Sequence, residues 1–268
     1  MQCQQLLTVL TSYVMFLAHA CSSGVQEPQP LRVLCYNIHY GQGNDGEYDL
    51  GRLAAVIRDA DPDLVALQEV DVVVERSGRV HQAQELARLT GMAVRYGPTQ
   101  HYQGGLYGNA VLTRLPISDV QIQPLPYTAA TAERTTYPRG AIAVTVRLNS
   151  GLLRFVSTHF QHNVPEDRVA EAKAINALFA VDGVTTILAG DMNATPDAEP
   201  VRILDRQWKN AIGREAAATA PSQAPRSRID YVFYRGSRLK LMSSKVIAES
   251  MASDHRPVLA VFEVSPAR

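Results

Sequence analysis

Short apolar runs, each long enough for one β-strand, recur along this chain of 268 residues and constrain its fold more than any other feature. Turn residues or helical patterns separate them, which is typical of strands buried in a sheet. The predicted strands are Arg32–Ile38, Leu64–Gln68, Ala93–Tyr96, Asn109–Thr113, Ala141–Leu148, Leu152–Thr158, Thr185–Ala189, Asp230–Tyr234, Lys245–Ala248 and Val258–Val264.

Helical periodicity lies between some of these strands. Asp49 is placed to cap a first helix, which Asp61-Pro62 would end. A second helix is predicted over Gln82–Leu89, and a third follows Pro165. Because the strands outnumber the helices and do not alternate strictly with them, we expect two packed sheets flanked by helices.

The amino-terminal segment differs from the rest of the chain. Residues 6–18 are mostly apolar and almost uncharged, but they are fewer than the roughly 20 residues that span a bilayer. Ala18-His19-Ala20 supplies a cleavage site of small residues, although Met1–Gln5 lacks the usual Lys or Arg. We therefore expect residues 1–20 to be a cleaved signal peptide and residues 21–30 to be a short linker.

Cys21 leaves two kinds of leader open. It directly follows the small residues, as in a lipoprotein signal, so it is either lipidated or an ordinary first residue of a secreted protein. In both cases the protein is expected to be exported, as a periplasmic, secreted or lipid-anchored protein of the cell envelope. Contact with a membrane is expected only through the leader or a lipidated Cys21.

Charge and cysteine content narrow the function classes. Lys and Arg number 26 and Asp and Glu number 26, so the formal net charge is zero. A protein that binds a long stretch of nucleic acid usually has a basic excess, so nucleic acid is an open but disfavoured substrate. Cys35 lies inside an apolar run and is expected to be a small buried core residue, not a nucleophile.

Polar side chains stand at the ends of several predicted strands, where packing alone does not require them. They are Asn37, His39, Glu69, His159, Asp191, Asn193, Asp230, Asp254 and His255. One such residue is usually a turn former, but the repetition indicates a ligand site, and such sites gather at strand ends in layered folds. Converging carboxylates repel one another unless a cation separates them, and oxygen donors suit magnesium or manganese. With histidines for proton transfer, the set predicts metal-assisted hydrolysis of a phosphate ester.

Five segments resemble the motifs of the endonuclease/exonuclease/phosphatase superfamily. They are Tyr36-Asn37-Ile38-His39, Leu67-Gln68-Glu69-Val70, Gly190-Asp191-Met192-Asn193, Arg228-Ile229-Asp230-Tyr231 and Ser253-Asp254-His255-Arg256-Pro257-Val258, in the family order. DNase-I-like nucleases, abasic-site endonucleases, sphingomyelinases and inositol polyphosphate 5-phosphatases belong to that superfamily. The resemblance implies one catalytic domain over residues 31–264, folded as a four-layer α/β sandwich of two packed mixed β-sheets flanked by helices.

The resemblance also implies a metal site. By position, Glu69 is the main metal ligand and Asn37 lies beside it. Asp254 is implied either to hold a second metal or to support the surroundings of His255. The implied cofactor is Mg²⁺ or Mn²⁺, and the implied partner is a phosphate-ester substrate.

Catalytic roles follow from the same positions. Asp191 is implied to position or deprotonate the attacking water, and Asn193 to donate to the transition-state phosphate. His255, oriented by Asp230, is implied to contact the phosphate or transfer a proton. His159 stands where nuclease relatives place a His or Tyr that assists the leaving oxygen.

Two further residues have alternative interpretations. Asn109, in Tyr107-Gly108-Asn109-Ala110, matches a loop of sphingomyelinase-like relatives in which the Asn approaches the phosphate, or it belongs to a turn that starts a strand. Arg139 is either a fork for a substrate phosphate or an ordinary solvated strand edge.

Three functions stay open. The leading hypothesis is a phosphodiesterase of the endonuclease kind. The alternative is a phosphatase or a sphingomyelinase-like phospholipase that acts on a lipid head group or a phosphorylated polyol. Residues 225–230 lack the aromatic-rich segment of the 5-phosphatases, which argues against close kinship with them. A non-catalytic binding module is disfavoured because the motif residues are intact.

Overall fold

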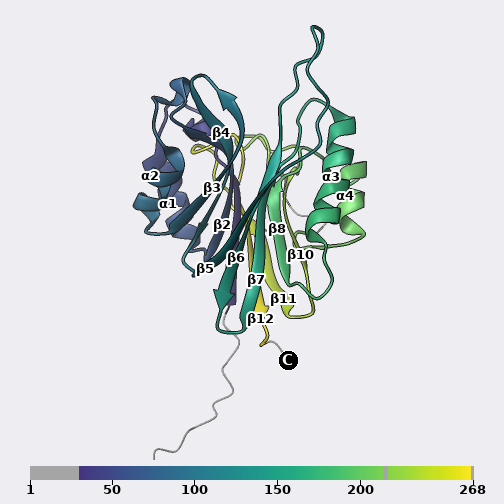
Figure 1. Cartoon of the computed structure of the whole chain (residues 1–268). Coiled ribbons are helices and arrows are strands. Elements are labelled where there is room, and N and C mark those ends of the chain that lie inside the picture. Colours follow the sequence, from purple (N-terminus) through teal and green to yellow (C-terminus); the bar gives the residue numbers. More distant parts are fainter. Residues whose placement is uncertain (1–29, 214–216, 267–268) are drawn as a thin grey trace, which may run out of the picture.

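Two mixed six-stranded sheets lie face to face at the centre of the molecule, in a computed structural model that describes residues 30–213 and 217–266 (Figure 1). In spatial order the first sheet contains β11 (Leu239–Val246), β12 (Val258–Val264), β1 (Pro30–Asn37), β2 (Leu64–Val72), β4 (Gly105–Thr113) and β3 (Ala93–Tyr102). The second contains β5 (Ile117–Pro124), β6 (Gly140–Leu148), β7 (Gly151–His159), β8 (Thr186–Asp191), β10 (Asp230–Arg235) and β9 (Lys209–Asn210). The predicted leader and Cys21 lie outside the described residues, as does nearly all of the predicted linker.

Helices cover the outer face of each sheet and complete the four layers (Figure 1). The first sheet carries α1 (Leu50–Ala60) and α2 (Gln82–Thr90), and the second carries α3 (Pro165–Phe179) and α4 (Glu199–Asp205). Short 3-10 turns, η1 (His39–Gly41) and η2 (Glu75–Ser77), follow β1 and β2. The predicted four-layer α/β sandwich is therefore confirmed. None of the helices in the described part of the chain is long and apolar enough to cross a membrane.

Strand periodicity explains why β1 reads as one continuous apolar run. Val33 and Cys35 point into the core between the sheets, whereas Leu34 and Tyr36 point into the core beneath α1 and α2. Successive side chains of a strand point to opposite faces, so a strand covered on both faces is apolar throughout. Cys35 is fully buried, which confirms its prediction as a core residue.

Parallel pairing brings the strand ends together. The strands β1 and β2 run parallel in one sheet, and β7 and β8 run parallel in the other, so all four end at the same rim of the sandwich. The strand β10 runs antiparallel to β8 and starts at Asp230, which pairs with Asp191. Likewise Val258 at the start of β12 pairs with Cys35 near the end of β1, so residues 253–255 return to that rim.

Helix ends follow the predicted signals. Asp49 caps α1, since its side chain accepts a hydrogen bond from the Arg52 N–H at 2.9 Å. The helix ends at Ala60, and Asp61 takes the left-handed conformation directly before Pro62. Leu53 and Ile57 on one face of α1 are fully buried, as their spacing predicts.

Some elements differ from the predictions. The sequence analysis omitted β5, α4 and β9, and it placed a strand over Lys245–Ala248, whereas β11 ends at Val246. The strand β5 is an edge strand in which exposed polar residues separate Ile117, Val120 and Ile122, so it has no apolar run. Elements that are short or half exposed bury too little apolar area to mark the sequence.

Candidate active site

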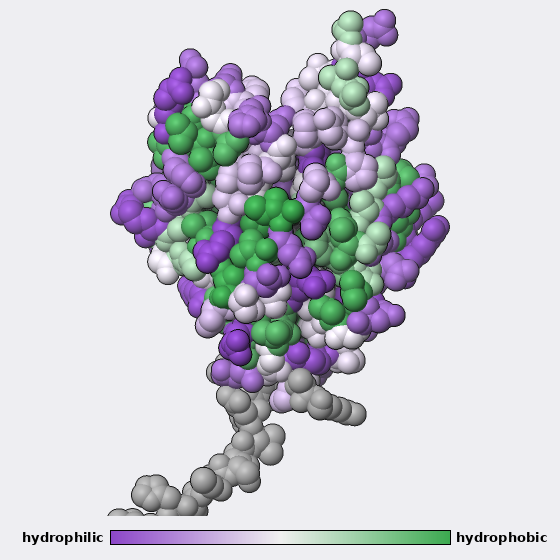
Figure 2. Space-filling model, viewed as in Figure 1, coloured by the Kyte–Doolittle hydropathy of each residue, from purple (hydrophilic) through white to green (hydrophobic). Residues whose placement is uncertain are grey.

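The rim where the strands end is hollowed between two lobes, as the notch at the top of Figure 2 shows. A pocket of about 350 Å³ lies there, lined by His39, Tyr40, Glu69, Arg76, Gln100, Tyr102, Tyr107, Tyr137, Arg139, His162 and Asp254. A larger hollow of about 1040 Å³, bordered by Leu152, Arg154 and Arg238, contains none of the predicted site residues. It lies near the starts of β7 and β8, at the opposite end of those strands, so the smaller pocket is the candidate site.

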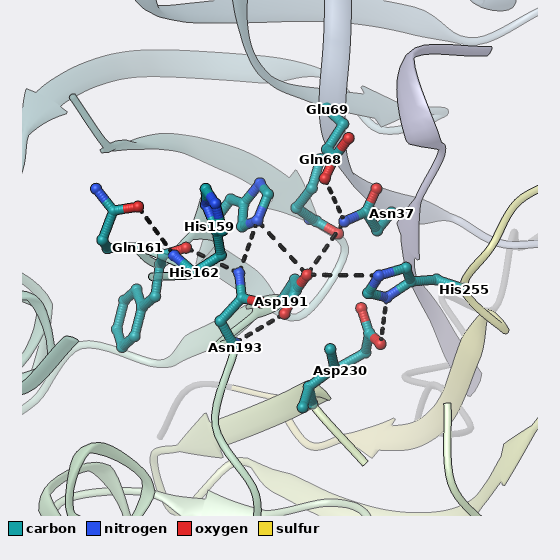
Figure 3. A network of polar contacts seen from close by, with 12 residues as sticks. Asn37, Gln68, Glu69, His159, Gln161, His162, Asp191, Asn193, Asp230 and His255 are labelled. Atoms are coloured by element: carbon teal, nitrogen blue, oxygen red, sulfur yellow. Dashed lines mark hydrogen bonds and ion pairs between the residues drawn. The ribbon is translucent and has the colours of Figure 1, made fainter. Parts of the chain in front are cut away.

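Asp191, the last residue of β8, is the centre of a polar network (Figure 3). Its Oδ1 accepts from the Asn193 N–H at 2.8 Å, and its Oδ2 accepts from Asn37 Nδ2 at 3.1 Å. The same Oδ2 lies 3.5 Å from Nε2 of His159 and 3.8 Å from Nε2 of His255. Three side chains, from the ends of β1 and β7 and from the segment before β12, therefore meet at the carboxylate that ends β8.

The electrostatics of Asp191 suit a base. Burial, with the nearby negative charge of Asp230, raises the pKa of Asp191 to about 7, against the lowering effect of His255 and two hydrogen bonds. A carboxylate with a pKa near neutrality can accept a proton from water far better than an ordinary Asp. The role of Asp191 in positioning or deprotonating the attacking water stays a prediction, and this geometry and pKa are the basis for the proposal made below.

His255 and Asp230 form a buried pair. Nδ1 of His255 lies 2.9 Å from Oδ2 of Asp230, and both side chains are almost fully buried. Burial lowers the pKa of His255, but the charge and hydrogen bond of Asp230, together with Asp191 and Asp254, outweigh it and leave the pKa well above its usual value. The raised pKa favours the protonated ring, whose Nε2 points toward Asp191.

Glu69 reaches the pocket through a bulge. Pairing between β2 and β4 shifts register between Leu67 and Val70, and Glu69 takes φ = 59° there. A bulge of this kind re-aims one side chain of a strand. The Glu69 carboxylate lines the pocket together with Asp254, whose Oδ2 lies 3.9 Å from Nε2 of His39.

The donor types of this oxygen-rich pocket suit a hard divalent cation. Glu69 and Asp254 share one solvent-open pocket in which Glu69 makes no ion pair with a cationic side chain of the described residues. A cation between two carboxylates would balance their charge, and oxygen donors suit magnesium or manganese. The sequence analysis left His39 out of its ligand set, although the imidazole lies beside Asp254.

A second candidate position for a cation overlaps the catalytic network. Asp191, Asp230 and His255 each offer one ligand atom, and these atoms lie within 4.8 Å of one another. His255 already supplies positive charge there as a protonated imidazole, and its Nδ1 is engaged by Asp230. A metal would have to displace that proton, so we favour the position at Glu69.

Asn37 acts as a donor in this structure. Its Nδ2 donates to Glu69 Oε1 at 3.2 Å and to Asp191 Oδ2 at 3.1 Å, while its Oδ1 accepts from the His39 N–H at 3.0 Å. The amide therefore links the metal-binding candidate Glu69 to the base candidate Asp191. Its predicted role as a metal ligand stays a prediction, and it would require the amide oxygen to leave His39.

His159 is held by an arginine from β6's amino-terminal flank. Nη1 of Arg139 lies 3.2 Å from Nδ1 of His159, and Nη2 lies 3.4 Å from Nδ1 of His162. Since a guanidinium only donates, Nδ1 of His159 accepts from Arg139, while its Nε2 lies 3.0 Å from Nδ2 of Asn193 and 3.5 Å from Oδ2 of Asp191. Burial, then Arg139, His255 and His162, keep the pKa of His159 well below its usual value, so the ring is neutral.

Arg139 is not a solvated strand edge. Only 5% of it is exposed, so that interpretation is wrong. It lines the pocket, while its Nη1 and Nη2 hold the two histidines. Its predicted contact with a substrate phosphate stays a prediction, and no carboxylate from the described residues orients Nδ1 of His159.

Asn109 lies away from the pocket lining. It is buried inside β4, not in a turn at the start of a strand, and its Nδ2 donates to the Gly140 carbonyl of the other sheet at 2.9 Å. The side chain thus ties the two sheets together. The structure gives no contact that supports its predicted approach to the phosphate.

Left-handed backbone concentrates at this rim. His39, Tyr40, Glu69 and Asn193 have φ between 43° and 59°. At Asn37 and Asp191 the side chain accepts the N–H two residues ahead, which bends the chain directly after the strand. Non-glycine residues with positive φ cluster at functional sites, where surrounding structure holds them.

Disruption of the Asp230–His255 pair should have effects that do not multiply. Asp230→Asn is expected to lose most of the activity that His255→Ala loses, and the double variant should be within about threefold of the worse single variant. Because Asp230 raises the pKa of His255, the alkaline fall in activity should start at lower pH in Asp230→Asn. Rates from pH 5 to 10 for all four proteins check this. Losses that multiply in full would show that the two residues act independently.

Known proteins resemble this chain in sequence and in fold. The model of the Endonuclease/Exonuclease/phosphatase family matches residues 34–255. YbhP of Escherichia coli K12, an uncharacterized protein, is 26% identical over 243 residues, covering 85% of this chain and 94% of YbhP. An endonuclease/exonuclease/phosphatase structure from Beutenbergia cavernae superposes with a TM-score of 0.71 at 24% identity, covering 88% of this chain and 72% of that one. The mannosyl-6-phosphatase of Bacteroides thetaiotaomicron superposes with a TM-score of 0.70 at 18% identity, covering 86% and 98%.

Proposed function

Because this chain belongs to the endonuclease/exonuclease/phosphatase family, we propose that it hydrolyses phosphate esters with a water molecule deprotonated by Asp191. That family includes metal-dependent phosphoesterases, both nucleases and phosphatases. The observation that carries the proposal is the convergence of Asn37, His159, Asn193 and His255 on the Asp191 carboxylate. A base of raised pKa surrounded by hydrogen-bond donors suits attack of water on a phosphorus atom.

Each residue has a task in this reaction. Water gives its proton to Asp191 as its oxygen bonds to phosphorus, and the bond from phosphorus to the leaving oxygen breaks. The protonated His255 donates to a phosphate oxygen that gains charge, and Asp230 keeps its proton on the ring. The neutral His159 turns its Nε2 toward the same region, 3.5 Å from Oδ2 of Asp191, and assists the leaving oxygen.

A divalent cation fits at Glu69 and Asp254, with His39 beside them. When bound, magnesium or manganese would neutralise the phosphate oxygens in the transition state. Asn37 would hold the Glu69 carboxylate at a fixed distance from the base, since its amide donates to both groups.

The pocket favours a compact substrate. Its volume of about 350 Å³ is the size of a small-molecule site, and the zero net charge does not favour a long nucleic-acid footprint. A phosphatase or phospholipase that acts on a small phosphorylated head group is therefore proposed ahead of an endonuclease.

One panel of substrates tests the proposal. Mature protein with magnesium or manganese should hydrolyse at least one of DNA, RNA, sphingomyelin, inositol phosphates and bis-(p-nitrophenyl) phosphate, and chelator should stop it. Faster turnover of the small esters than of DNA would support a small phosphorylated substrate ahead of nucleic acid. Absence of metal-dependent hydrolysis across the whole panel would contradict the proposed function.

We also propose that the protein acts outside the cytoplasm. The basis is the short apolar run that ends in Ala18-His19-Ala20-Cys21. Mass analysis of native protein should find residues 1–20 removed, and a lipid mass on Cys21 would select the lipoprotein form. A native protein that keeps its apolar segment would contradict this expectation.

A further inference from the structure

Arg76, which the sequence analysis did not single out, lies on the pocket wall in a fixed orientation. Its Nε and Nη2 donate to the two oxygens of Asp71 at 2.9 and 3.0 Å, and the Asp71 side chain is fully buried. A bidentate pair of this kind fixes both the position and the plane of a guanidinium. The backbone is fixed as well, because the Arg76 N–H donates to Gln103 Oε1 at 3.1 Å.

Tyrosine rings surround this guanidinium. Its central carbon lies 3.7 Å from the ring centre of Tyr40, 4.7 Å from that of Tyr102 and 5.5 Å from that of Tyr107. Tyr40 is itself held, since the buried Gln82 donates from Nε2 to its carbonyl oxygen and accepts from the Asp71 N–H. Stacking on aromatic faces and the buried ion pair together keep Arg76 rigid.

One edge of Arg76 is left for the pocket. Asp71 takes Nε and Nη2, and no hydrogen bond to another described residue is made by Nη1. Arg76 lines the same pocket as Glu69 and Asp254, together with Gln100 and Tyr102. The guanidinium thus belongs to the wall that a substrate meets beyond its reacting phosphate.

Charge decides which chemical group suits this wall. Asp71 already balances the positive charge of Arg76, and the tyrosines around it are neutral. Arg139, the other guanidinium that lines this pocket, is engaged by His159 and His162. A second phosphate would add about two negative charges beside a guanidinium whose charge Asp71 already balances. Those charges would also lie close to Glu69 and Asp254. Neutral hydroxyls, by contrast, can accept from Nη1 and donate to Gln100.

We propose that Arg76 is a specificity residue that hydrogen-bonds hydroxyl groups on the non-reacting part of a phosphorylated polyol or sugar. The inference rests on the proposed function and names the substrate class of that same site. A fixed donor that meets a substrate hydroxyl discriminates strongly against an analogue without it, because the donor is then left unpaired.

Two esters of equal ring size test this. Inositol 1-phosphate carries ring hydroxyls, and cyclohexyl phosphate lacks them. The wild type should show a kcat/KM at least about tenfold higher for the inositol ester. Arg76→Lys keeps a positive charge for Asp71 but loses the planar fork, so it should raise KM for the inositol ester about ten- to hundredfold. Its kcat, and its kinetics with cyclohexyl phosphate, should change by less than about threefold.

Arg79→Lys is the matched control. Arg79 follows the same turn, pairs with Glu75 at 3.4 Å and is exposed, so its kinetics should equal those of the wild type. If Arg76→Lys melts at a lower temperature than the control, Gln100→Leu takes its place. That residue is only partly buried on β3 and should also reduce the preference for the inositol ester.

Calorimetry of both esters with chelated protein gives a readout without turnover. Tighter binding of the inositol ester, lost in Arg76→Lys, would support the inference even if the hydrolysis assay failed. The inference would be overturned if the wild type bound and hydrolysed the two esters equally well. It would also be overturned if Arg76→Lys lost affinity and kcat/KM equally for both esters. Hydrolysis of nucleic acid without binding of the inositol ester would also overturn it and leave the proposed function standing. Failure of all hydrolysis would instead count against the proposed function.

Discussion

Asp191→Asn is expected to reduce phosphate-ester hydrolysis by about a thousandfold or more, because it removes the base and leaves the surrounding donors in place. The amide cannot accept the proton of the attacking water. Its oxygen can still accept from the Asn193 N–H, so the turn after β8 should persist. Steady-state rates at pH 7 to 9 measure the effect, and Asp182→Asn, at a fully exposed carboxylate, is the control.

The same variant should gain relative stability as the pH rises. The pKa of Asp191 is about 7 in the folded protein and about 3.9 in an unfolded chain, so its ionisation weakens folding between those values. The penalty is absent below pH 4 and complete above pH 7, and asparagine does not carry it. With chelator present, the difference in melting temperature between Asp191→Asn and the wild type should be more positive at pH 8 than at pH 5. Retention of wild-type turnover by Asp191→Asn would contradict the assignment of the base.

Glu69→Gln is expected to reduce the rate of hydrolysis by a similar factor, because it weakens binding of the metal. The substitution keeps the size of the side chain but removes the charge that holds a hard cation. Loss of several kcal/mol of charge stabilisation corresponds to about a thousandfold in rate. Hydrolysis measured against magnesium and manganese concentration should show a much weaker metal dependence in Glu69→Gln. Zinc should activate the wild type poorly, because carboxylates and an amide form no Cys/His cage.

Glu75→Gln is the control for that experiment, since Glu75 is an exposed glutamate in the turn after β2. It should titrate metal as the wild type does. Melting temperatures should be similar for all three proteins, because Glu69 lines an open pocket and glutamine can still accept the hydrogen bond from Asn37. Full activity of chelated wild type, or identical metal titrations of Glu69→Gln and wild type, would rule out the metal position at Glu69.

The layers can be predicted from the sequence because strands that are buried on both faces appear as continuous apolar runs. The strand β12 has the predicted bounds, Val258–Val264, and Asp49 and Asp61 delimit α1 as expected. The polar residues that close β1, β2, β7 and β8 could be found for the opposite reason, because they interrupt apolar runs. Their convergence then follows from parallel pairing, which sends the carboxyl ends of neighbouring strands to one rim.

Other features depend on contacts that no local pattern records. Arg76 pairs with Asp71 and stacks on Tyr40 and Tyr102, residues that come from separate segments. Arg139 looks solvated in the sequence because it follows proline in a polar stretch, yet the loop after β7 covers it and His159 accepts from it. Only the sum of such long-range contacts decides whether a charged side chain is buried.

The backbone at the pocket rim shows how function and stability oppose each other in this fold. Glu69 and Asn193 hold left-handed conformations that glycine adopts at no steric penalty, and such residues cost of order 1–3 kcal/mol each. Glycine at either position would relax the chain, but it would delete the side chain that the chemistry needs. The molecule therefore tolerates local strain at its working end because three buried apolar cores elsewhere outweigh it. The packed layers supply the thermal stability of this protein, and the strained backbone at the rim lowers it.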